Sequence, residues 1–312
     1  MLSPKQQEKL RSLLKGELLF EEPLAKYTSL KIGGPAQILF YPTDLEDLSK
    51  ALQWCKTSDC PYFILGSGSN LLVRDGGIRA MVCKLSRALN QLTVQENEKS
   101  EDVFIEVEAG YSLAKLVELS RQKGWTGIES LFGIPGTLGG ALVMNAGTRE
   151  GEIGTRVEEV SVMNSDGEVR KIPAKRLHFE YRFLKLNRGE ILIKAKLRLK
   201  KVDASEVAER IQFFQKRRFE TQPLDQANVG SIFKNPPKKF AAQLIEELGL
   251  KGVRVGGARI SEKHSNWIIN EGGATAQDVL ALIGLVKDKV KETAEIKLEV
   301  EVKVVGEEAN SD

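Results

Sequence analysis

One segment in the C-terminal third of the chain places a hydroxyl group where it could transfer a proton. Residues 230–236 read Gly-Ser-Ile-Phe-Lys-Asn-Pro, a pattern typical of an exposed functional turn. No histidine lies near Ser231 in the sequence, so an activated serine nucleophile is not indicated. A hydroxyl is a weak acid, but it can protonate a strongly basic carbanion or enolate. The alternative is a structural role for Ser231 as a helix or turn cap.

Charged side chains suited to anionic chemistry occur in two other segments. Arg182 lies in Glu-Tyr-Arg-Phe, ahead of a predicted strand, and its planar guanidinium could bind two oxygens of a carboxylate or phosphate. Glu299 and Glu301 alternate with apolar residues, so they share one face of a strand. A carboxylate near a strand end could polarise a substrate or shuttle a proton. The alternatives are a surface ion pair for Arg182 and a solvated strand face for the glutamates.

Two glycine-rich segments predict close approach of the backbone to a ligand. Residues 132–147 carry five glycines among small or apolar residues, and an ordinary helix would avoid so many, at about 1 kcal/mol each. Residues 66–70, Gly-Ser-Gly-Ser-Asn, follow a predicted buried strand. Neither segment is a Rossmann fingerprint or a P-loop. Two such segments indicate a large dinucleotide bound through main-chain N–H groups, although a tightly packed turn without ligand is the alternative.

Hydrophobic periodicity predicts the elements that position these residues. A helix is expected within 3–20, one capped by Thr43 or Asp44, one from Ser112 to Gly124, and others over 204–219, 240–248 and 275–293. Strands are expected at 37–41, 62–65, 78–85, 103–109, 191–199, 267–269 and 296–305, with a hairpin over 157–172. The segments 37–41 and 62–65 flank a helix, which predicts parallel strands with the 66–70 loop at a carboxyl end, where ligands bind. The tail 307–312 is expected to be disordered.

Composition narrows the class of protein. The 312 residues suggest two or three domains, and 41% hydrophobic with 29% charged residues is ordinary for a soluble protein. The net charge of +3 is too weak to argue for nucleic acid. No run of about 18 apolar residues and no signal peptide is visible, so a cytoplasmic protein without a membrane span is expected. The three cysteines lack metal spacing and are expected to be buried thiols, and no metal site is predicted: Cys55, Cys60 and Cys83.

Six segments in order resemble one known family. They are residues 31–36, 65–72, 134–141, 181–182, 230–236 and 298–302. Together they are similar to UDP-N-acetylenolpyruvoylglucosamine reductase, a flavoenzyme family of bacterial peptidoglycan synthesis. The resemblance runs from about residue 27 to residue 306. Each motif alone is modest, but six in order are specific.

The resemblance implies an α+β fold of the vanillyl-alcohol-oxidase/p-cresol-methylhydroxylase FAD-binding type, with a third, substrate-binding α+β domain. The implied boundaries are 1–84 for an N-terminal FAD-binding α/β subdomain, closed by the C-terminal segment 297–312, then 85–205 for a second FAD-binding subdomain and 206–296 for the substrate-binding domain. FAD is expected to be non-covalent, which agrees with the absence of histidine from both glycine-rich segments.

The resemblance also implies a reaction in two halves. NADPH reduces FAD and leaves, and the flavin then delivers hydride to the enolpyruvyl ether of the UDP-linked substrate. Ser231 matches the proton donor, and Arg182 and Glu301 match the residues that stabilise the enolate beside the substrate carboxylate. Glu299 does not match the catalytic carboxylate, so Glu301 is preferred.

The glycine-rich segments and the resemblance assign the binding residues. The expected FAD contacts are Gly33, Gly66, Ser67, Gly68, Ser69, Asn70, Ile134, Pro135, Gly136, Thr137, Gly139, Gly140, Asn145, Ala146 and Gly147. Asn235 matches a substrate-binding position. A family lysine that contacts the diphosphate is missing from residues 220–223, and Lys234 or Lys263 could replace it. No insertion carrying a substrate-capping tyrosine is visible, so the chain looks like the shorter form of the family.

Two other functions remain open on the sequence. One is an FAD oxidase of the same fold that acts on a sugar or alcohol with oxygen. The other is a nucleotide-binding protein without enzymatic activity, in which Ser231, Arg182 and Glu301 are structural. The chain is expected to act as a monomer on small molecules, namely the UDP-linked substrate and NADPH.

Overall fold

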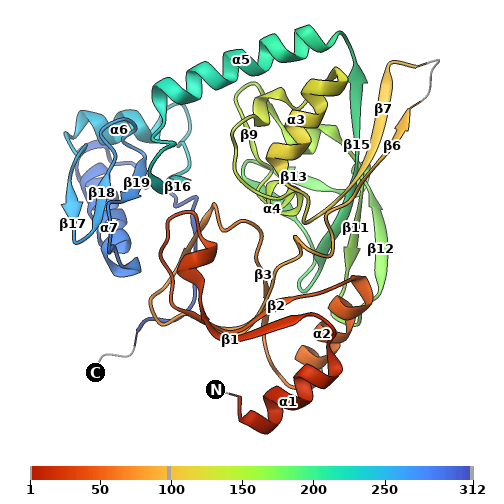
Figure 1. The fold of residues 1–312 in the computed structure, drawn as a ribbon. Helices are drawn as coiled ribbons and strands as arrows, with labels where there is room; N and C mark the ends of the chain where they lie inside the picture. Colours follow the sequence, from red (N-terminus) through yellow and green to blue (C-terminus); the bar gives the residue numbers. More distant parts are fainter. Residues whose placement is uncertain (1, 97–99, 310–312) are drawn as a thin grey trace. The chain divides into compact units, whose positions relative to one another are not determined.

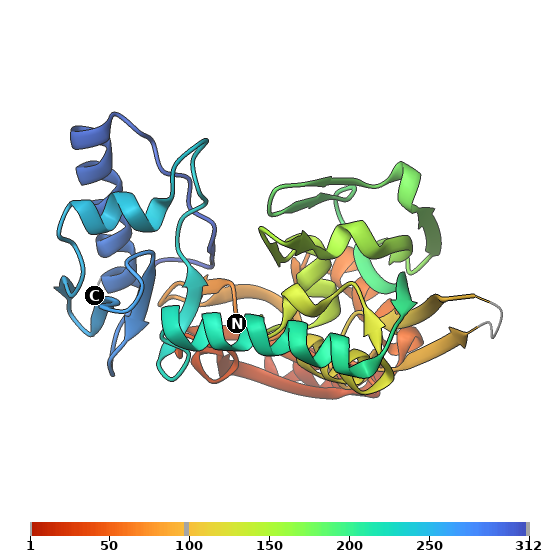
Figure 2. The same cartoon turned by 90° about the horizontal axis from the view of Figure 1, so that it is seen from above.

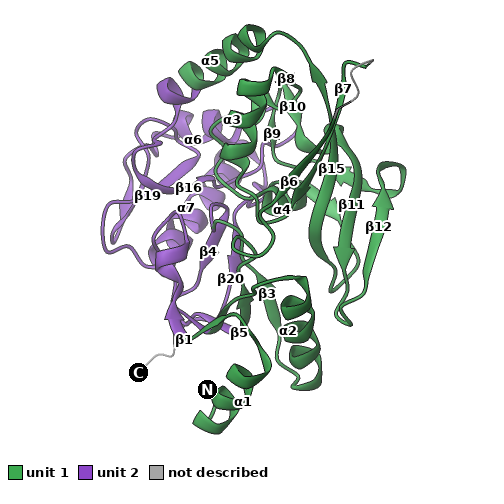
Figure 3. Ribbon diagram, turned by 45° about the vertical axis from the view of Figure 1, so that its right-hand side comes forward, with its two compact units in different colours: residues 1–20, 38–67, 80–217 green, residues 21–37, 68–79, 218–312 purple. Residues whose placement is uncertain are grey.

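A computed structural model describes residues 2–96 and 100–309 of the chain (Figure 1). Helices are interspersed with runs of consecutive strands along the sequence, and α5 (Ala204–Thr221) forms one continuous helix (Figure 2). The chain divides into two compact units (Figure 3). Unit 1 comprises residues 1–20, 38–67 and 80–217, and unit 2 comprises residues 21–37, 68–79 and 218–312. The three-part division at residues 84/85 and 205/206 stays a prediction.

The helices of unit 1 begin where the sequence predicts. In α1 (Pro4–Leu13), Ser3 and Gln6 form a capping box, and Asp44 caps α2 (Leu45–Thr57). Ser112 caps α3 (Leu113–Lys123), and Gly124 closes it in the left-handed conformation at φ 67°. These predictions are confirmed because caps and apolar stripes are local signals.

A four-stranded sheet in the order β1-β2-β5-β3 contains both strands of the first predicted crossover, whose parallel direction stays a prediction. β2 (Pro35–Tyr41) and β3 (Tyr62–Ile64) share the sheet, and β5 (Ile78–Cys83) lies between them, parallel to β3. The first strand, β1 (Glu17–Pro23), lies at the edge. The 66–70 loop leaves the carboxyl end of β3, as expected for a ligand-binding loop.

An antiparallel sheet forms the larger part of unit 1, in the order β12-β11-β15-β7-β6, with β8 (Trp125–Thr126) also paired to β15. The predicted hairpin is β11 (Val157–Met163) and β12 (Val169–Pro173), paired from Glu159↔Pro173 to Met163↔Val169. β7 (Asp102–Glu108) and β15 (Ile191–Lys201) bury alternate residues in the core. β6 (Leu92–Glu96) completes the sheet, and residues 97–99 lie outside the described residues.

Short strand pairs and 3₁₀ turns complete unit 1. The strand pairs are β9 (Gly147–Thr148) with β10 (Gly151–Glu152), and β13 (His178–Glu180) with β14 (Phe183–Lys185). The 3₁₀ turns of unit 1 are η2 (Glu129–Leu131), η3 (Ile153–Arg156) and η4 (Ala174–Arg176). These small elements carry Gly147 and flank Arg182.

Unit 2 packs an antiparallel sheet against two helices. The sheet order is β16-β19-β18-β17, formed by β16 (Ala227–Ser231), β19 (Trp267–Asn270), β18 (Ala258–Ile260) and β17 (Arg254–Val255). The helices are α6 (Ala241–Glu247) and α7 (Ala276–Ala294), and η1 (Leu24–Tyr27) is a further 3₁₀ turn. Thr275 and Asp278 form the capping box of α7, which confirms the predicted start of this helix.

The predicted strand 296–305 is wrong over most of its length. Only β20 (Lys303–Val305) is a strand, and it pairs in parallel with β4 (Leu71–Val73). Before it, Val300 forms a single bridge with Phe233. The segment with alternating residues therefore pairs at one residue only and does not join a sheet. The expected disorder of the tail is also wrong at Glu307, because it pairs with Gly77, whereas residues 310–312 lie outside the described residues.

Candidate active site

The two glycine-rich segments lie next to each other in unit 1. A β-carbon built on Gly66 would lie 2.9 Å from the Thr137 hydroxyl oxygen. Thr137 is buried and caps α4 (Leu138–Val143), where its hydroxyl accepts from the Gly140 N–H at 3.4 Å. Lys84 Nζ donates to the Gly66 carbonyl at 2.9 Å, and burial lowers the pKa of Lys84. Segments far apart in sequence therefore form one small-residue surface with a cation beside it.

The glycine-rich segment 132–147 contains a short helix, although its glycine content argues against one. α4 includes Gly139 and Gly140. A β-carbon on Gly139 would lie 3.0 Å from the Ala109 β-carbon, and the Gly139 N–H donates to the Ala109 carbonyl at 2.8 Å. Tertiary packing thus overrides helix propensity, because only glycine allows this approach.

The other predicted FAD-loop residues lie in unit 2, where protein packing accounts for the glycines. Gly68 has φ 64°, and a β-carbon there would lie 2.2 Å from the Tyr27 carbonyl oxygen. Gly33 has φ 146° and approaches Val73. Asn70 Nδ2 donates to the Glu301 carbonyl at 3.3 Å, and the Asn70 carbonyl accepts from the Lys303 N–H at 3.1 Å.

Arg182 is held in a strained backbone conformation between β13 and β14. Its φ is 59°, which is unusual for a residue other than glycine and points to a functional constraint. Its Nη2 donates to the Gly147 carbonyl at 3.0 Å, and Nη1 lies 3.7 Å from Glu152 Oε1. The guanidinium also packs over the Tyr181 ring, 4.7 Å from its centroid. The arginine is therefore oriented by three neighbours.

Asn145 organises this arginine site. It is buried, at φ 41°, and its Nδ2 donates to Glu152 Oε2 at 2.7 Å and to the Glu180 carbonyl at 3.0 Å. Its Oδ1 accepts from the Gly154 N–H at 3.1 Å. The carboxamide thus fixes Glu152, which the sequence analysis missed. No local signal identifies Glu152, because its relation to Arg182 spans about 30 residues of chain.

Ser231 lies at the end of a bulged strand in unit 2. The register of β16 against β19 shifts between Asn228 and Ser231, so one extra residue is inserted there. Gly230, at φ 76°, occupies the bulge, and its N–H donates to Asn228 Oδ1 at 3.1 Å. The bulge redirects the chain at the predicted proton donor, as bulges next to active sites do.

The segment after Ser231 is bridged to the segment that carries Glu301. The Glu301 N–H donates to the Ile232 carbonyl at 2.8 Å, and the Lys234 N–H donates to the Glu299 carbonyl at 2.9 Å. Two predicted catalytic residues, 70 positions apart in sequence, therefore belong to adjoining backbones. Within unit 2 the residue after Ser231 is hydrogen-bonded to the Glu301 backbone.

The two glutamates have different surroundings. The Glu299 side chain is 70% exposed and pairs with Lys234 Nζ at 2.6 Å. Glu301 is half-buried. Lys234, a predicted diphosphate ligand, is thus engaged with a neighbouring carboxylate. The other substrate candidates also make local contacts, since Asn235 Oδ1 accepts from the Ala241 N–H at 3.1 Å and Lys263 Nζ donates to the Phe219 carbonyl.

Comparison with known proteins identifies the family. Residues 36–173 match the family model described as FAD binding domain, and residues 222–305 match the one described as UDP-N-acetylenolpyruvoylglucosamine reductase, C-terminal domain. The chain is 44% identical over 300 residues to the UDP-N-acetylenolpyruvoylglucosamine reductase of Geobacter metallireducens, covering 96% of this chain and 98% of that protein. The chain belongs to the UDP-N-acetylenolpyruvoylglucosamine reductase family.

Further relatives of this reductase family agree. The reductase of Alkaliphilus oremlandii is 43% identical, over 93% of this chain and 94% of that protein. The crystal structure of UDP-N-acetylenolpyruvylglucosamine reductase from Thermus caldophilus matches with a TM-score of 0.77 and 37% identity, over 93% of this chain and 99% of that chain. The expected FAD-binding fold and the oxidoreductase class are confirmed.

In the part of the chain that the structure describes, no group of three or more His, Cys, Asp or Glu side chains is arranged to hold a metal ion. Within the same residues, no helix combines the length and the apolar character that crossing a bilayer needs.

Proposed function

We propose that this reductase-family chain converts the enolpyruvyl ether of UDP-N-acetylglucosamine into UDP-N-acetylmuramate for peptidoglycan synthesis, with NADPH as the reductant. The relatives named above are called UDP-N-acetylenolpyruvoylglucosamine reductases, which supports reduction of this substrate. The observation that carries the proposal is the bridge between the Ser231 segment and the Glu301 segment. It joins a hydroxyl acid and a carboxylate on adjoining backbones, which suits protonation of a carbanionic centre.

FAD is the proposed hydride carrier, bound without a covalent link. When bound, it supplies hydride transfer between the reduced nicotinamide and the substrate double bond. The adjoining glycine-rich segments fit such a group, because Gly66 faces Thr137 without a side chain between them and Gly140 is exposed. The residues proposed to hold it in unit 1 are Gly66, Ser67, Ile134, Pro135, Gly136, Thr137, Gly139, Gly140, Ala146 and Gly147. Asn145 supports this set through Glu152. Gly33, Gly68, Ser69 and Asn70, which belong to unit 2, are proposed as further FAD contacts from their match to the family motifs.

The proposed proton chemistry uses three side chains. Hydride addition to the terminal methylene carbon leaves negative charge on the adjacent carbon and its carboxylate. Arg182 binds that carboxylate through its planar fork of donors, and Glu301 stabilises the enolate beside it. Ser231 Oγ gives its proton to the adjacent carbon, and solvent then reprotonates the serine oxygen. The half-buried setting of Arg182 supports its role, because the attraction between its guanidinium and the substrate carboxylate strengthens away from water.

The proposed nucleotide contacts come from Asn235, Lys234 and Lys263. Lys234 already pairs with Glu299, so a diphosphate there would have to displace this carboxylate or share the ammonium with it. Lys263 belongs to the 261–267 turn next to β19. We also propose that the protein is a cytoplasmic monomer with the three-part domain division given above.

The test begins with the visible absorption spectrum of the purified protein. Two bands of oxidised flavin are expected, and anaerobic NADPH should bleach them. Addition of the enolpyruvyl substrate should restore the bands and yield UDP-N-acetylmuramate. Rapid re-oxidation by air without any need for the substrate would favour an oxidase. A protein that stays colourless after incubation with FAD and desalting would remove both flavin functions.

A further inference from the structure

Asn266 is a buried polar residue next to the Ser231 segment, outside the set of residues with a proposed role. It is 4% exposed. Its Oδ1 accepts from the Phe233 N–H at 3.0 Å, and its Nδ2 donates to the Phe233 carbonyl at 2.8 Å. Its own carbonyl accepts from the Ile232 N–H at 2.9 Å. One residue therefore binds three backbone groups of the two residues that follow Ser231.

The turn that carries Asn266 is itself fixed by hydrogen bonds. Ser261 Oγ accepts from the Lys263 N–H at 3.2 Å and the His264 N–H at 3.3 Å. The Ser261 N–H donates to the Trp267 carbonyl at 2.8 Å, and the Trp267 N–H donates to the His264 carbonyl at 3.0 Å. Both ends of the 261–267 turn are thereby tied together, so the Asn266 carboxamide is held by a rigid support.

The Ile232–Phe233 backbone is consequently held from two sides. Asn266 binds it on one side, and the opposite side accepts the Glu301 N–H through the Ile232 carbonyl at 2.8 Å. Ser231 precedes this segment, and Glu301 is bonded to it. A shift of the segment would thus move the hydroxyl acid and the carboxylate relative to each other.

We propose that Asn266 is a positioning residue for proton delivery, because its carboxamide binds the Phe233 N–H and carbonyl and so fixes the backbone next to the Ile232 carbonyl, which lies between Ser231 and its bond to Glu301. This inference rests on the proposed function, in which Ser231 is the proton donor. It deepens that function by assigning the orientation of the donor to a residue that touches no reacting atom. A displacement of about 1 Å at a reacting group can cost on the order of 100-fold in rate.

The experiment compares the two half-reactions in Asn266→Ala. NADPH bleaching of the flavin should keep its rate, whereas substrate-dependent re-oxidation and product formation should slow on the order of 10- to 100-fold. The solvent deuterium isotope effect on the second half-reaction should rise, because protonation becomes slower. A purely structural role would not produce this split. If the alanine variant folds poorly, Asn266→Asp gives a second measurement, since it keeps the acceptor but loses the donor to the Phe233 carbonyl.

Two further variants separate the possible outcomes. Asn270→Ala is the matched control, because this asparagine ends β19, the strand that follows the turn with Asn266, and its Nδ2 instead donates to the Leu30 carbonyl at 3.0 Å. It should leave both half-reactions unchanged. In a Ser231→Ala background, Asn266→Ala should add little further loss.

The outcomes for the proposed function and for this inference differ. Normal product formation in Ser231→Ala would show that Ser231 is not the proton donor, which would overturn its role in the proposed function. A collapse in Ser231→Ala with a normal second half-reaction in both Asn266 variants would overturn this inference alone. Equal loss of both half-reactions, or failure of both Asn266 variants to fold, would make Asn266 a structural residue and also overturn it.

Discussion

The Glu301 N–H donates to the Ile232 carbonyl at 2.8 Å, directly after Ser231 in the chain. Together with the bond from the Lys234 N–H to the Glu299 carbonyl, it ties the C-terminal segment to the chain after the bulged end of β16 within unit 2. The two segments meet in one isolated bridge, between Phe233 and Val300. The bond also makes the roles of Ser231 and Glu301 separately testable, because each side chain can be changed while the backbone contact remains.

Replacement of Ser231 by alanine should separate the two halves of the reaction. NADPH should still bleach the flavin, since no step of that half uses the hydroxyl. Product formation should fall by about 10²- to 10⁴-fold, the usual contribution of a positioned acid. Stopped-flow absorbance and product assay measure the two halves. Normal turnover in this variant would show that another group supplies the proton.

Replacement of Glu301 by glutamine should lower turnover much more than the same change at Glu299. Both variants remove one negative charge from the same strand-like segment. Glu299 is 70% exposed and pairs with Lys234, and such surface pairs contribute about 0–1 kcal/mol. Steady-state turnover of the two purified variants is the measurement. Equal losses of turnover would mean that Glu301 contributes no more to the reaction than Glu299.

The local elements of this fold could be predicted from the sequence, whereas the nonlocal ones could not. The start of α7 is predictable because Thr275 and Asp278 signal it within four residues. The short α4 depends on the approach of Gly139 to Ala109, 30 positions earlier. The bridge from Val300 to Phe233 likewise replaces a predicted strand with a contact that no local pattern indicates.

The candidate site divides in the same way. Ser231, Arg182 and Glu301 stand out by residue type and by their motifs. Asn266 and Glu152 do not, because their importance comes from hydrogen bonds to Phe233 and Asn145. An asparagine next to an apolar strand is a weak signal, since buried polar groups are recognised only when their partners are known.

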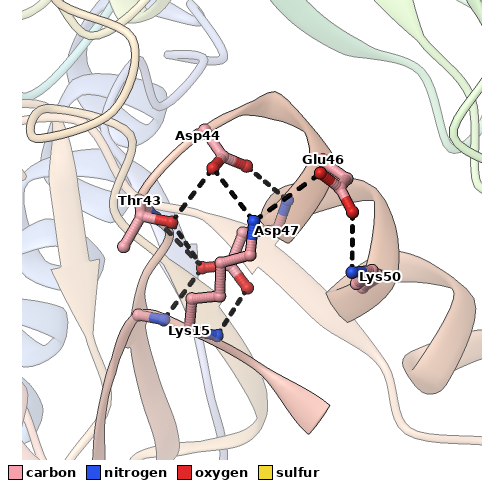
Figure 4. Close-up of polar contacts among 7 residues, drawn as sticks. Lys15, Thr43, Asp44, Glu46, Asp47 and Lys50 are labelled. Carbon is pink, nitrogen blue, oxygen red and sulfur yellow. Dashed lines mark hydrogen bonds and ion pairs between the residues drawn. The ribbon is translucent and has the colours of Figure 1, made fainter.

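Replacement of Asp47 by alanine should destabilise the protein strongly. Its fully buried carboxylate accepts the N–H groups of Lys15 at 2.9 Å, Gly16 at 2.9 Å and Thr43 at 3.0 Å (Figure 4). Its loss leaves three N–H groups without this acceptor, so the free energy of unfolding should fall by about 3 kcal/mol or more. Urea unfolding followed by circular dichroism measures the change.

The matched control for Asp47 is Asp44→Ala. Asp44 caps α2, and its Oδ1 accepts the Asp47 N–H at 2.8 Å. Loss of such a cap costs about 1 kcal/mol. The two variants remove the same charge from the same turn, so only the number of hydrogen bonds and the burial differ. Asp47 connects residues 15–16, which directly precede β1, to the start of α2. Equal destabilisation by the two variants would show that this connection does not stabilise the fold more than the helix cap does.

Cys60 should react as a thiolate at unusually low pH. The sequence analysis expected three buried thiols, but Cys60 is only half-buried, whereas Cys55 and Cys83 are buried. The neighbouring Cys55 thiol, as a donor to the Cys60 thiolate, lowers the pKa of Cys60 from its ordinary value of 9.0 to about 7. Alkylation needs the thiolate, which forms above the pKa, so the iodoacetamide rate should rise with pH to a midpoint near 7.

Two variants and an internal reference complete this test. Cys55→Ser keeps a hydroxyl donor and should leave the midpoint low, whereas Cys55→Ala removes the donor and should move it toward 9. Cys83 is the reference, because burial raises its pKa to about 12 and should prevent its alkylation in the folded protein. Mass spectrometry of the alkylated peptides separates the sites. A midpoint near 9 in the unchanged protein would show that Cys55 does not stabilise the Cys60 thiolate.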